Sequence, residues 1–489
     1  MSAPDTSGAS YLTSLADTLG ASEHALRLLI SILLGYPIVL YHRNFLYARS
    51  PQQQHLLFTV TGFLVAYFCY GWDIVHLIAT VSGVYFILLA FGGTFLGSIL
   101  TLIFTMSYLM YGYFVTSTDV YDIKWTMPHC VLTLRLTGVA IDMYDGAQKQ
   151  ETLSSENKKS ALQERPSVLA LFGHSFFPSA FLVGPQFHMK RYLDLVAGKL
   201  IPSTSATVLP DCTRPALIRF GTGVLYLCGY QVLTIWVPDM YPDSESFMEQ
   251  GIIMKHFMLG LWGRTTLYKY ISCWLITEGV CILSGITYNG KDDKNVTKWD
   301  GCANVRLSVF EGCTKFNHYI IAFNTNTNHW ISQYVYKRLK FLNSKVASQL
   351  GALGFLAIWH GFHSGYYVCF FNEFIVMLME KEVETLLARN EKAAAFLSSP
   401  LVSPFIWVIL KLYTFVFMGF CLVPFVLLSF NRYWAVYKGP QAFSTEKCPS
   451  GLSIVKHCFE CDLALPNFNV IVVTGWYSND KIIMVCALQ

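Results

Sequence analysis

Residues 346–379 read VASQLGALGFLAIWHGFHSGYYVCFFNEFIVMLM, and this stretch decides how the rest of the chain is interpreted. It carries no acidic or basic side chain before Glu373 except two histidines, His360 and His363, near its middle. The stretch is longer than the roughly 20 apolar residues that cross a bilayer. A titratable group is costly to keep at membrane depth, so it is by default a candidate for function. The pattern predicts a membrane segment that carries a functional site.

The composition of the whole chain agrees with a membrane location. Of 489 residues, 53% are hydrophobic and only 13% are charged, and the mean hydropathy is +0.41. Soluble domains carry about 25% charged residues. The apolar blocks predict an all-α polytopic membrane protein with about 10–11 transmembrane helices around an intramembrane reaction chamber. The net charge of +4 gives no reason to expect a nucleic-acid partner.

The apolar blocks also give approximate helix bounds. We expect spans at 25–41, 55–70, 74–91, 95–114, 216–237 and 405–430. The segment 125–143 contains Arg135 and Asp142, and we therefore expect it to face protein or a water-filled cavity rather than lipid. The segment 254–286 contains Glu278 among several cations, namely Lys255, Arg264 and Lys269. We expect Glu278 to pair with one of these cations, either as a structural ion pair or in a catalytic role.

Three regions follow from these patterns. Residues 1–24 form a polar tail, residues 25–438 form a multi-span catalytic domain, and residues 439–489 form a tail of mixed composition. In the last region only 469–476 is apolar, which is too short to span a membrane. The first tail is acidic, whereas Arg43 and Arg49 follow the first span. The positive-inside rule then places the N-terminus in the lumen.

The two central histidines admit several roles. On a continuous helix His360, His363 and Ser364 would share one face. A structural histidine remains open. A metal site is disfavoured because we find no second closely spaced histidine pair, and Gly361 to Gly365 does not form the G-x-S-x-G pattern of a serine nucleophile. General base catalysis by a neutral imidazole is the fourth interpretation, since the pKa of histidine lies near working pH.

A base of this kind needs a polar partner that orients it or holds developing charge. Asn324 is a candidate, because it lies on a different segment in the unusually polar patch Asn324-Thr325-Asn326-Thr327-Asn328. An amide stays neutral and so costs less to bury than an acid. The alternative is that this patch is a loop of ordinary turn-forming residues. The residues alone leave both interpretations open.

The polar patch with Trp330, then Tyr334-Val335-Tyr336-Lys337-Arg338, then Trp359-His360-Gly361, resembles the membrane-bound O-acyltransferase family. Residues 121–130, 181–187 and 267–281 extend the resemblance to members that acylate lysophospholipids. The resemblance implies that His360 and Asn324 are the catalytic pair. Further substrate-binding candidates on the matching segments are Trp359, His363, Ser364, Trp330, Lys337, Arg338 and Lys340.

The resemblance also implies a reaction. Acyl-CoA would enter from the cytosol as a co-substrate, and no cofactor or metal is expected. Its acyl group, expected to be polyunsaturated, would pass to the free sn-2 hydroxyl of a lysophospholipid, above all lysophosphatidylcholine. The expected location is the endoplasmic reticulum membrane, and a homodimer stays open. Residues 439–489 depart from the family, which would supply another span and a lysine-rich end. Alternatives are another acyl acceptor (a sterol, diacylglycerol or protein) or a polytopic transporter.

Overall fold

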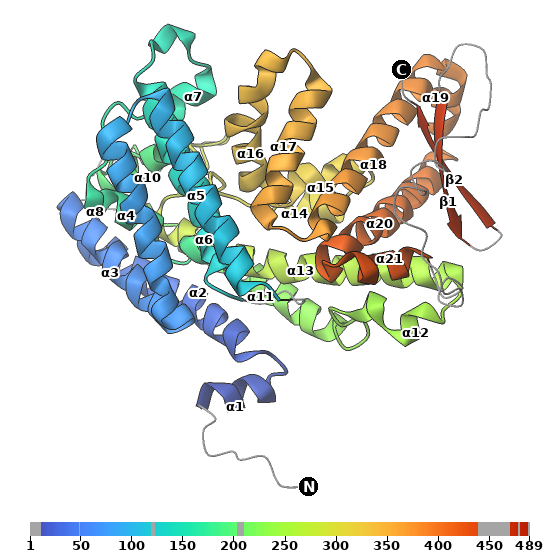
Figure 1. Ribbon diagram of the computed structural model, residues 1–489, viewed down its shortest axis with the longest axis horizontal. Coiled ribbons are helices and arrows are strands. Elements are labelled where there is room, and N and C mark those ends of the chain that lie inside the picture. Colours follow the sequence, from blue (N-terminus) through green and yellow to red (C-terminus); the bar gives the residue numbers. More distant parts are fainter. Residues whose placement is uncertain are drawn as a thin grey trace. The chain divides into compact units, whose positions relative to one another are not determined.

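The computed structural model describes residues 11–47, 49–118, 123–202, 210–438, 470–477 and 480–487. Its first helices can be followed along the colour bar of Figure 1. They are α1 (Tyr11–Thr18), α2 (Glu23–Tyr41), α3 (Pro51–Tyr70), α4 (Ile74–Phe91), α5 (Phe95–Thr116), α6 (Thr126–Gly146), α7 (Ser155–Ser160), α8 (Val168–Ser175), α9 (Ala180–Val183), α10 (Met189–Val196) and α11 (Thr213–Leu233).

Ten further α-helices follow in the described residues, which also contain five short helical segments of other types. The α-helices are α12 (Glu245–Met248), α13 (Ile252–Ser284), α14 (Leu307–Glu311), α15 (Phe316–Ala322), α16 (Thr325–Tyr334), α17 (Lys345–His360), α18 (Ser364–Arg389), α19 (Glu391–Leu397), α20 (Ser403–Leu427) and α21 (Phe430–Lys438). The others are the π-helix η1 (His42–Leu46) and the 3₁₀ segments η2 (Gly71–Asp73), η3 (Gln150–Thr152), η4 (Tyr241–Asp243) and η5 (Tyr336–Leu342).

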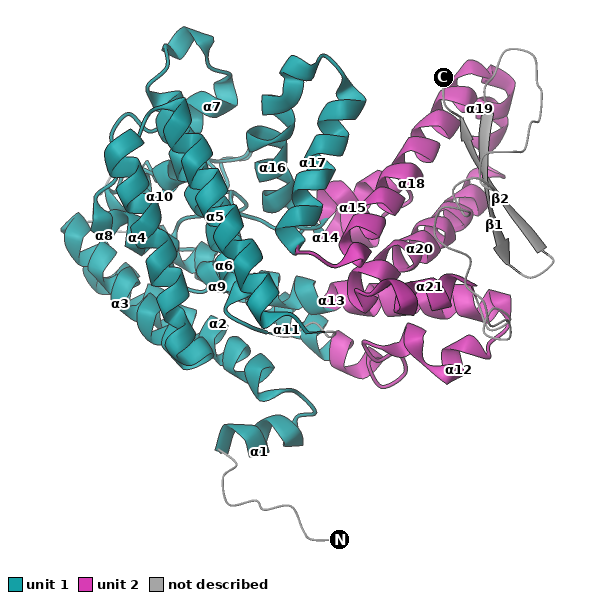
Figure 2. Ribbon diagram, viewed as in Figure 1, with its two compact units in different colours: residues 1–228, 269–306, 323–360 teal, residues 229–268, 307–322, 361–489 magenta. Residues whose placement is uncertain are grey.

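The chain forms two compact units, coloured separately in Figure 2. Unit 1 comprises residues 1–228, 269–306 and 323–360, and unit 2 comprises residues 229–268, 307–322 and 361–489. Asn324 and His360 both belong to unit 1, whereas His363 and Ser364 belong to unit 2. The three predicted sequence regions describe a different division and stay a prediction.

Five segments of the described chain are long and apolar enough to cross a membrane. They are residues 23–46, 51–91, 95–116, 213–233 and 403–427. The second segment contains two helices, α3 and α4, separated by η2. The prediction of a predominantly helical, multi-pass membrane protein is confirmed, while the number of about 10–11 spans stays a prediction that rests on segment length.

Helix α6 is buried on nearly every side within unit 1. Arg135 and Asp142, which would be costly in lipid, are 3% and 1% exposed. The Arg135 guanidinium donates to four backbone carbonyls, those of His174, Ser175, Ala180 and Pro185. The expectation that this segment faces protein rather than lipid is therefore confirmed.

The decisive apolar stretch is not one helix, which corrects the prediction of a shared face for His360 and His363. Helix α17 ends at His360, and α18 begins at Ser364. Between them Gly361 has a φ of 131°, a backbone conformation that glycine adopts far more readily than other residues. The spacing argument from helix periodicity therefore does not apply across Gly361.

The described end of the chain is a β-hairpin. Strand β1 (Val470–Tyr477) pairs with β2 (Asp480–Ala487) in antiparallel register, with Val470 opposite Ala487. It contains most of the 469–476 patch that was judged too short to span. The remainder of the predicted divergent tail, residues 439–469, 478–479 and 488–489, lies outside the described residues.

Candidate active site

Asn324 stands immediately before α16 in a left-handed backbone conformation, with φ 50° and ψ 45°. Asparagine is one of the few residues other than glycine that adopt this conformation. Its side chain makes no capping hydrogen bond to the helix that it precedes. The amide of Asn324 is therefore not used as a helix cap, although asparagine is among the preferred capping residues.

The neighbouring polar side chains behave differently. The Asn326 side-chain amide donates to the carbonyls of Cys302 and Ala303 at 3.1 and 3.0 Å. The Asn328 side chain donates to the Phe323 carbonyl at 3.0 Å. The interpretation of this patch as a turn-forming loop is wrong for residues 325–328, because they form the start of α16 and the Asn326 side chain bonds to the separate segment at Cys302 and Ala303. It does not account for the Asn324 side chain.

Trp330 and Trp359 help to join α16 and α17 to the rest of unit 1. Both lie in one buried apolar cluster with residues of α5 and α6, including Leu109 and Leu134. The Trp359 indole donates to the Cys130 carbonyl at 3.0 Å. Trp330 stacks on Phe355 of α17, with ring centroids 5.8 Å apart. These contacts make both tryptophans part of the packing that fixes the two helices.

The stacked pair of Trp330 and Phe355 also relates Asn324 to His360. Helices α16 and α17 lie side by side and run in opposite directions (Figure 1). Asn324 precedes Trp330 by six residues and His360 follows Phe355 by five, so each lies about 8–9 Å along its helix from the stacked pair. Because the helices are antiparallel, both displacements point to the same end of the pair.

The His360 ring is partly buried beside Trp359. The two ring centroids are 4.7 Å apart in an edge-to-face arrangement. A position on the last residue of a helix leaves the imidazole at the boundary between α17 and the glycine bend. The apolar wall and the proximity to the Asn324 end of α16 are compatible with a base that works out of bulk water.

His363 and Ser364 belong to unit 2. His363 precedes α18 without a side-chain capping bond, and its ring lies 6.2 Å from that of Tyr366. Ser364 is exposed and receives a hydrogen bond from the Tyr433 hydroxyl at 3.1 Å. Their predicted substrate contacts stay predictions.

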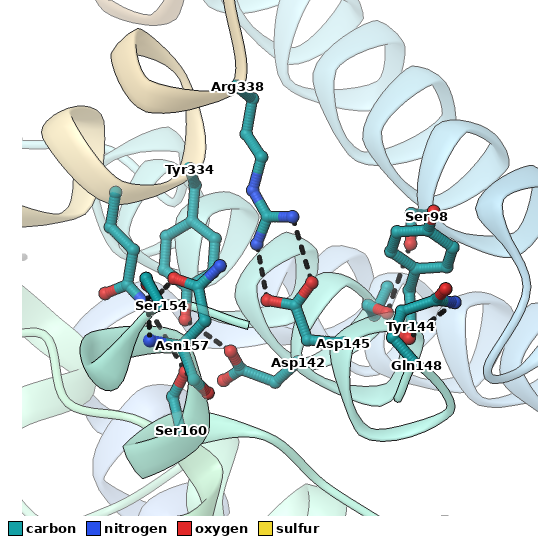
Figure 3. Close-up of polar contacts among 12 residues, drawn as sticks. Ser98, Asp142, Tyr144, Asp145, Gln148, Ser154, Asn157, Ser160, Tyr334 and Arg338 are labelled. Atoms are coloured by element: carbon teal, nitrogen blue, oxygen red, sulfur yellow. Dashed lines mark hydrogen bonds and ion pairs between the residues drawn. The ribbon is translucent and has the colours of Figure 1, made fainter. Parts of the chain in front are cut away.

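The three basic candidates on η5 have different surroundings. Both terminal nitrogens of Arg338 donate to the Asp145 carboxylate of α6, one of them at 2.9 Å, as Figure 3 shows. Lys337 forms an ion pair with Glu156. Lys340 is exposed, and its side chain has no hydrogen-bond or ion-pair partner among the described residues. The predicted ligand contacts of all three residues stay predictions.

These ion pairs shift the pKa values of groups outside the candidate spans. Partial burial opposes the charged form of Arg338, but the hydrogen bond and the charge of Asp145 outweigh it, and the pKa of Arg338 is raised. Burial also opposes ionisation of Glu156, yet the hydrogen bond from Lys337 and the charge of His329 hold its pKa below the ordinary value. Arg338 is therefore protonated and Glu156 is ionised at neutral pH.

The Arg338→Ala variant is expected to destabilise the protein by about 2–3 kcal/mol, because it leaves a buried carboxylate without its partner. Asp145 is 1% exposed on its side chain. Lys337→Ala, the matched control, is expected to cost less than about 1 kcal/mol, since the side chains of that pair are 40% and 27% exposed. Thermal unfolding in detergent measures both, and equal shifts for the two variants would contradict this assignment.

Glu278 has a different partner from the one expected. It pairs with Arg219 of α11 at 3.0 Å rather than with Lys255, Arg264 or Lys269 of its own helix. The structural ion-pair interpretation is thus correct in kind, but the expected partner was wrong. On a straight helix Arg264 and Lys269 lie about 21 and 14 Å from Glu278 along the axis, too far for a contact.

A polar cavity of about 210 Å³ lies beside α16 in unit 1. The Tyr334 hydroxyl donates to Asp142 at 2.7 Å (Figure 3) and lies 2.9 Å from the His188 ring. Sequence reasoning missed this cavity, although Asp142 in an apolar segment was a signal of buried polar structure. Within the described ranges no three His, Cys, Asp or Glu side chains cluster as a metal site would require.

Residues 110–423 match the membrane-bound O-acyltransferase family. The chain belongs to this family, and the protein is accordingly an acyltransferase. The resemblance to this family that the sequence showed is therefore confirmed.

Individual relatives share most of the chain. It is 43% identical over 429 residues to lysophospholipid acyltransferase 5 of Mus musculus, covering 87% of each chain. It is 40% identical to lysophospholipid acyltransferase 5 of Drosophila melanogaster, covering 86% of this chain and 85% of the relative. The Caenorhabditis elegans protein of the same name is 36% identical, with 86% and 88% covered.

Proposed function

We propose that the protein transfers a fatty acyl group from acyl-CoA to the free sn-2 hydroxyl of a lysophospholipid, most favourably lysophosphatidylcholine. Family membership and the similarity to lysophospholipid acyltransferases 5 support the acceptor class. The observation that carries the catalytic assignment is that Asn324, whose side chain does not cap its helix, precedes α16 at the end where α17 terminates in His360.

In the proposed reaction the neutral imidazole of His360 accepts the proton of the acceptor hydroxyl while its oxygen attacks the thioester carbonyl. The Asn324 amide donates to the oxygen that gains negative charge. The carbon–sulfur bond then breaks, and the imidazolium returns its proton to the departing thiolate. The products are the diacyl phospholipid and CoA, and both catalytic residues end in their starting states.

The proposal includes a location and an orientation. The protein would lie in the endoplasmic reticulum membrane with its N-terminus in the lumen, and CoA would enter and leave on the cytosolic side. The positive-inside pattern around the first span supports this orientation. Asn324 and His360 come from a single chain, so the proposal holds for a monomer and a homodimer alike.

The test uses purified full-length protein in detergent with a polyunsaturated acyl-CoA. Release of free thiol is followed together with diacyl lipid for lysophosphatidylcholine, lysophosphatidylethanolamine, lysophosphatidylserine, a sterol and diacylglycerol. The expected result is stoichiometric thiol and phospholipid, fastest with lysophosphatidylcholine. Product only from a sterol or diacylglycerol would reject the proposed acceptor, and flux across liposomes without acyl transfer would indicate a transporter.

Lys340→Ala is expected to raise the KM for acyl-CoA about three- to tenfold with little change in kcat, because a solvated cation contributes about 1 kcal/mol toward a phosphate. The effect should shrink at high salt, where charges are screened. Lys392→Ala, at another surface lysine on α19 of unit 2, is the matched control. A salt-independent KM in the parent protein would count against the phosphate contact.

A further inference from the structure

The backbone of Asn324 is held in a conformation that needs outside support. A residue other than glycine with positive φ persists only where its surroundings over-determine it, and such positions gather at functional sites. Asn324 has a φ of 50°, and its side chain does not cap α16. The support must therefore come from the residues on either side of it.

Both flanks of Asn324 are fixed to one short loop, residues 303–305. On the N-terminal side, Phe323 pairs with Val305 in an isolated antiparallel bridge. On the C-terminal side, the Thr325 amide donates to the Asn304 carbonyl at 3.0 Å. The Thr325 hydroxyl also donates to the Ala303 carbonyl at 2.6 Å. Asn324 is thus held between two anchored neighbours.

The loop is in turn clamped by a buried ion pair. One carboxylate oxygen of Glu278 accepts from the backbone amides of Asn304 and Val305, at 2.5 and 3.2 Å. Its other oxygen pairs with the Nε of Arg219 at 3.0 Å. Arg219 also donates to the Val305 carbonyl at 3.2 Å. Glu278 is 2% exposed, so water does not compete for these bonds.

We propose that Glu278, assisted by Arg219, is a positioning residue that sets the Asn324 side chain for acyl transfer through the 303–305 loop. This inference rests on the proposed function. Glu278 need not touch substrate, because its bonds reach Asn324 only through Asn304, Val305 and their partners. A carboxylate suits the role, since it accepts from two backbone amides and pairs with a cation at once.

Glutamine cannot reproduce this arrangement. It keeps one acceptor oxygen for the Asn304 and Val305 amides, but presents an NH₂ group to the Arg219 donor. The loop would shift rather than unfold, and a misplacement of about 1 Å near a reacting centre can cost about 10²-fold in rate. We expect Glu278→Gln to lower kcat about 10- to 100-fold with the KM for both substrates changed less than about twofold.

The decisive experiment is a double-variant cycle. Kinetic constants are measured for the parent, Glu278→Gln, Asn324→Gly and the double variant, with glycine chosen because it tolerates positive φ. If Glu278 acts through Asn324, Glu278→Gln should change kcat less than about threefold in the Asn324→Gly background. Independent, multiplying effects would overturn the positioning role and leave Glu278 as a purely structural residue.

Two further variants keep the test decisive. Thr325→Val removes the hydrogen bond from the Thr325 hydroxyl to the Ala303 carbonyl and leaves the ion pair intact. It should lower kcat, and its effect should also be non-additive with that of Asn324→Gly. This variant replaces Glu278→Gln if that protein does not fold. Glu311→Gln, which alters the Arg264–Glu311 pair of unit 2, should keep the parent kcat. If Asn324→Gly alone keeps the parent kcat, the catalytic assignment of Asn324 fails, and the inference falls with it. If Asn324→Gly lowers kcat but its effect is additive with that of Glu278→Gln, the inference is rejected while the proposed function stands.

Discussion

The His360→Ala variant is expected to lose about 10²–10⁴-fold in kcat, because that is the usual contribution of a positioned general base. Without the imidazole, the acceptor hydroxyl would have to attack the thioester while still holding its proton. The KM values should change little, since the base acts in the transition state rather than in substrate binding. Free thiol release and diacyl lipid formation by purified protein measure the effect.

The control is His256→Ala, because within the described residues the His256 side chain bonds only to the Ile252 carbonyl one turn earlier in α13. It should keep the parent rate and the parent elution volume in size-exclusion chromatography. Near-normal turnover by a folded His360→Ala protein would refute the base assignment. His360 would then have a packing role beside Trp359, with which its ring is in edge contact.

The Arg135→Met variant is expected to destabilise unit 1 by about 3–5 kcal/mol, because it removes a buried guanidinium that donates to four backbone carbonyls. The guanidinium reaches His174 and Ser175 with one nitrogen and Ala180 and Pro185 with the other. It also lies over the Phe187 ring, 4.8 Å from its centroid. Methionine fills the volume but offers no hydrogen bond, so α8 and α9 lose these hydrogen bonds to α6.

Thermal unfolding in detergent, followed by tryptophan fluorescence and by the monodisperse fraction after heating, measures this loss. Arg214→Met is the matched control, since Arg214 is exposed near the start of α11. Arg135→Lys should fall between the parent and Arg135→Met, because an ammonium group reaches fewer of the four carbonyls. An unchanged unfolding temperature for Arg135→Met would show that other donors satisfy these carbonyls.

Much of the helical architecture could be predicted from hydrophobic patterning. The span expected at 74–91 coincides with α4, and the spans expected at 55–70 and 95–114 lie within α3 and α5. These segments are easy to predict because a helix in lipid must be continuously apolar and must form all its backbone hydrogen bonds internally. The burial of α6 was predictable for the same reason, since its charges could not face lipid.

The details of the candidate site could not be predicted from local pattern. The end of α17 depends on the backbone of Gly361, and an apolar run of this length gives no sign of a break. The pairing of Glu278 with Arg219, and of Arg338 with Asp145, joins residues far apart in the chain. Sequence spacing could identify Asn324 as polar and unusual, but not that its side chain leaves α16 uncapped.

The end of α17 at His360 has an electrostatic consequence. The last carbonyls of a helix carry a partial negative charge equivalent to about half an electron, which favours a cation at that end by about 0.3–1 kcal/mol. In the proposed reaction, the His360 imidazole would be neutral beforehand and positive once it holds the acceptor's proton. The dipole of α17 therefore stabilises His360 in its protonated form, a contribution that one unbroken helix through Gly361 would not provide.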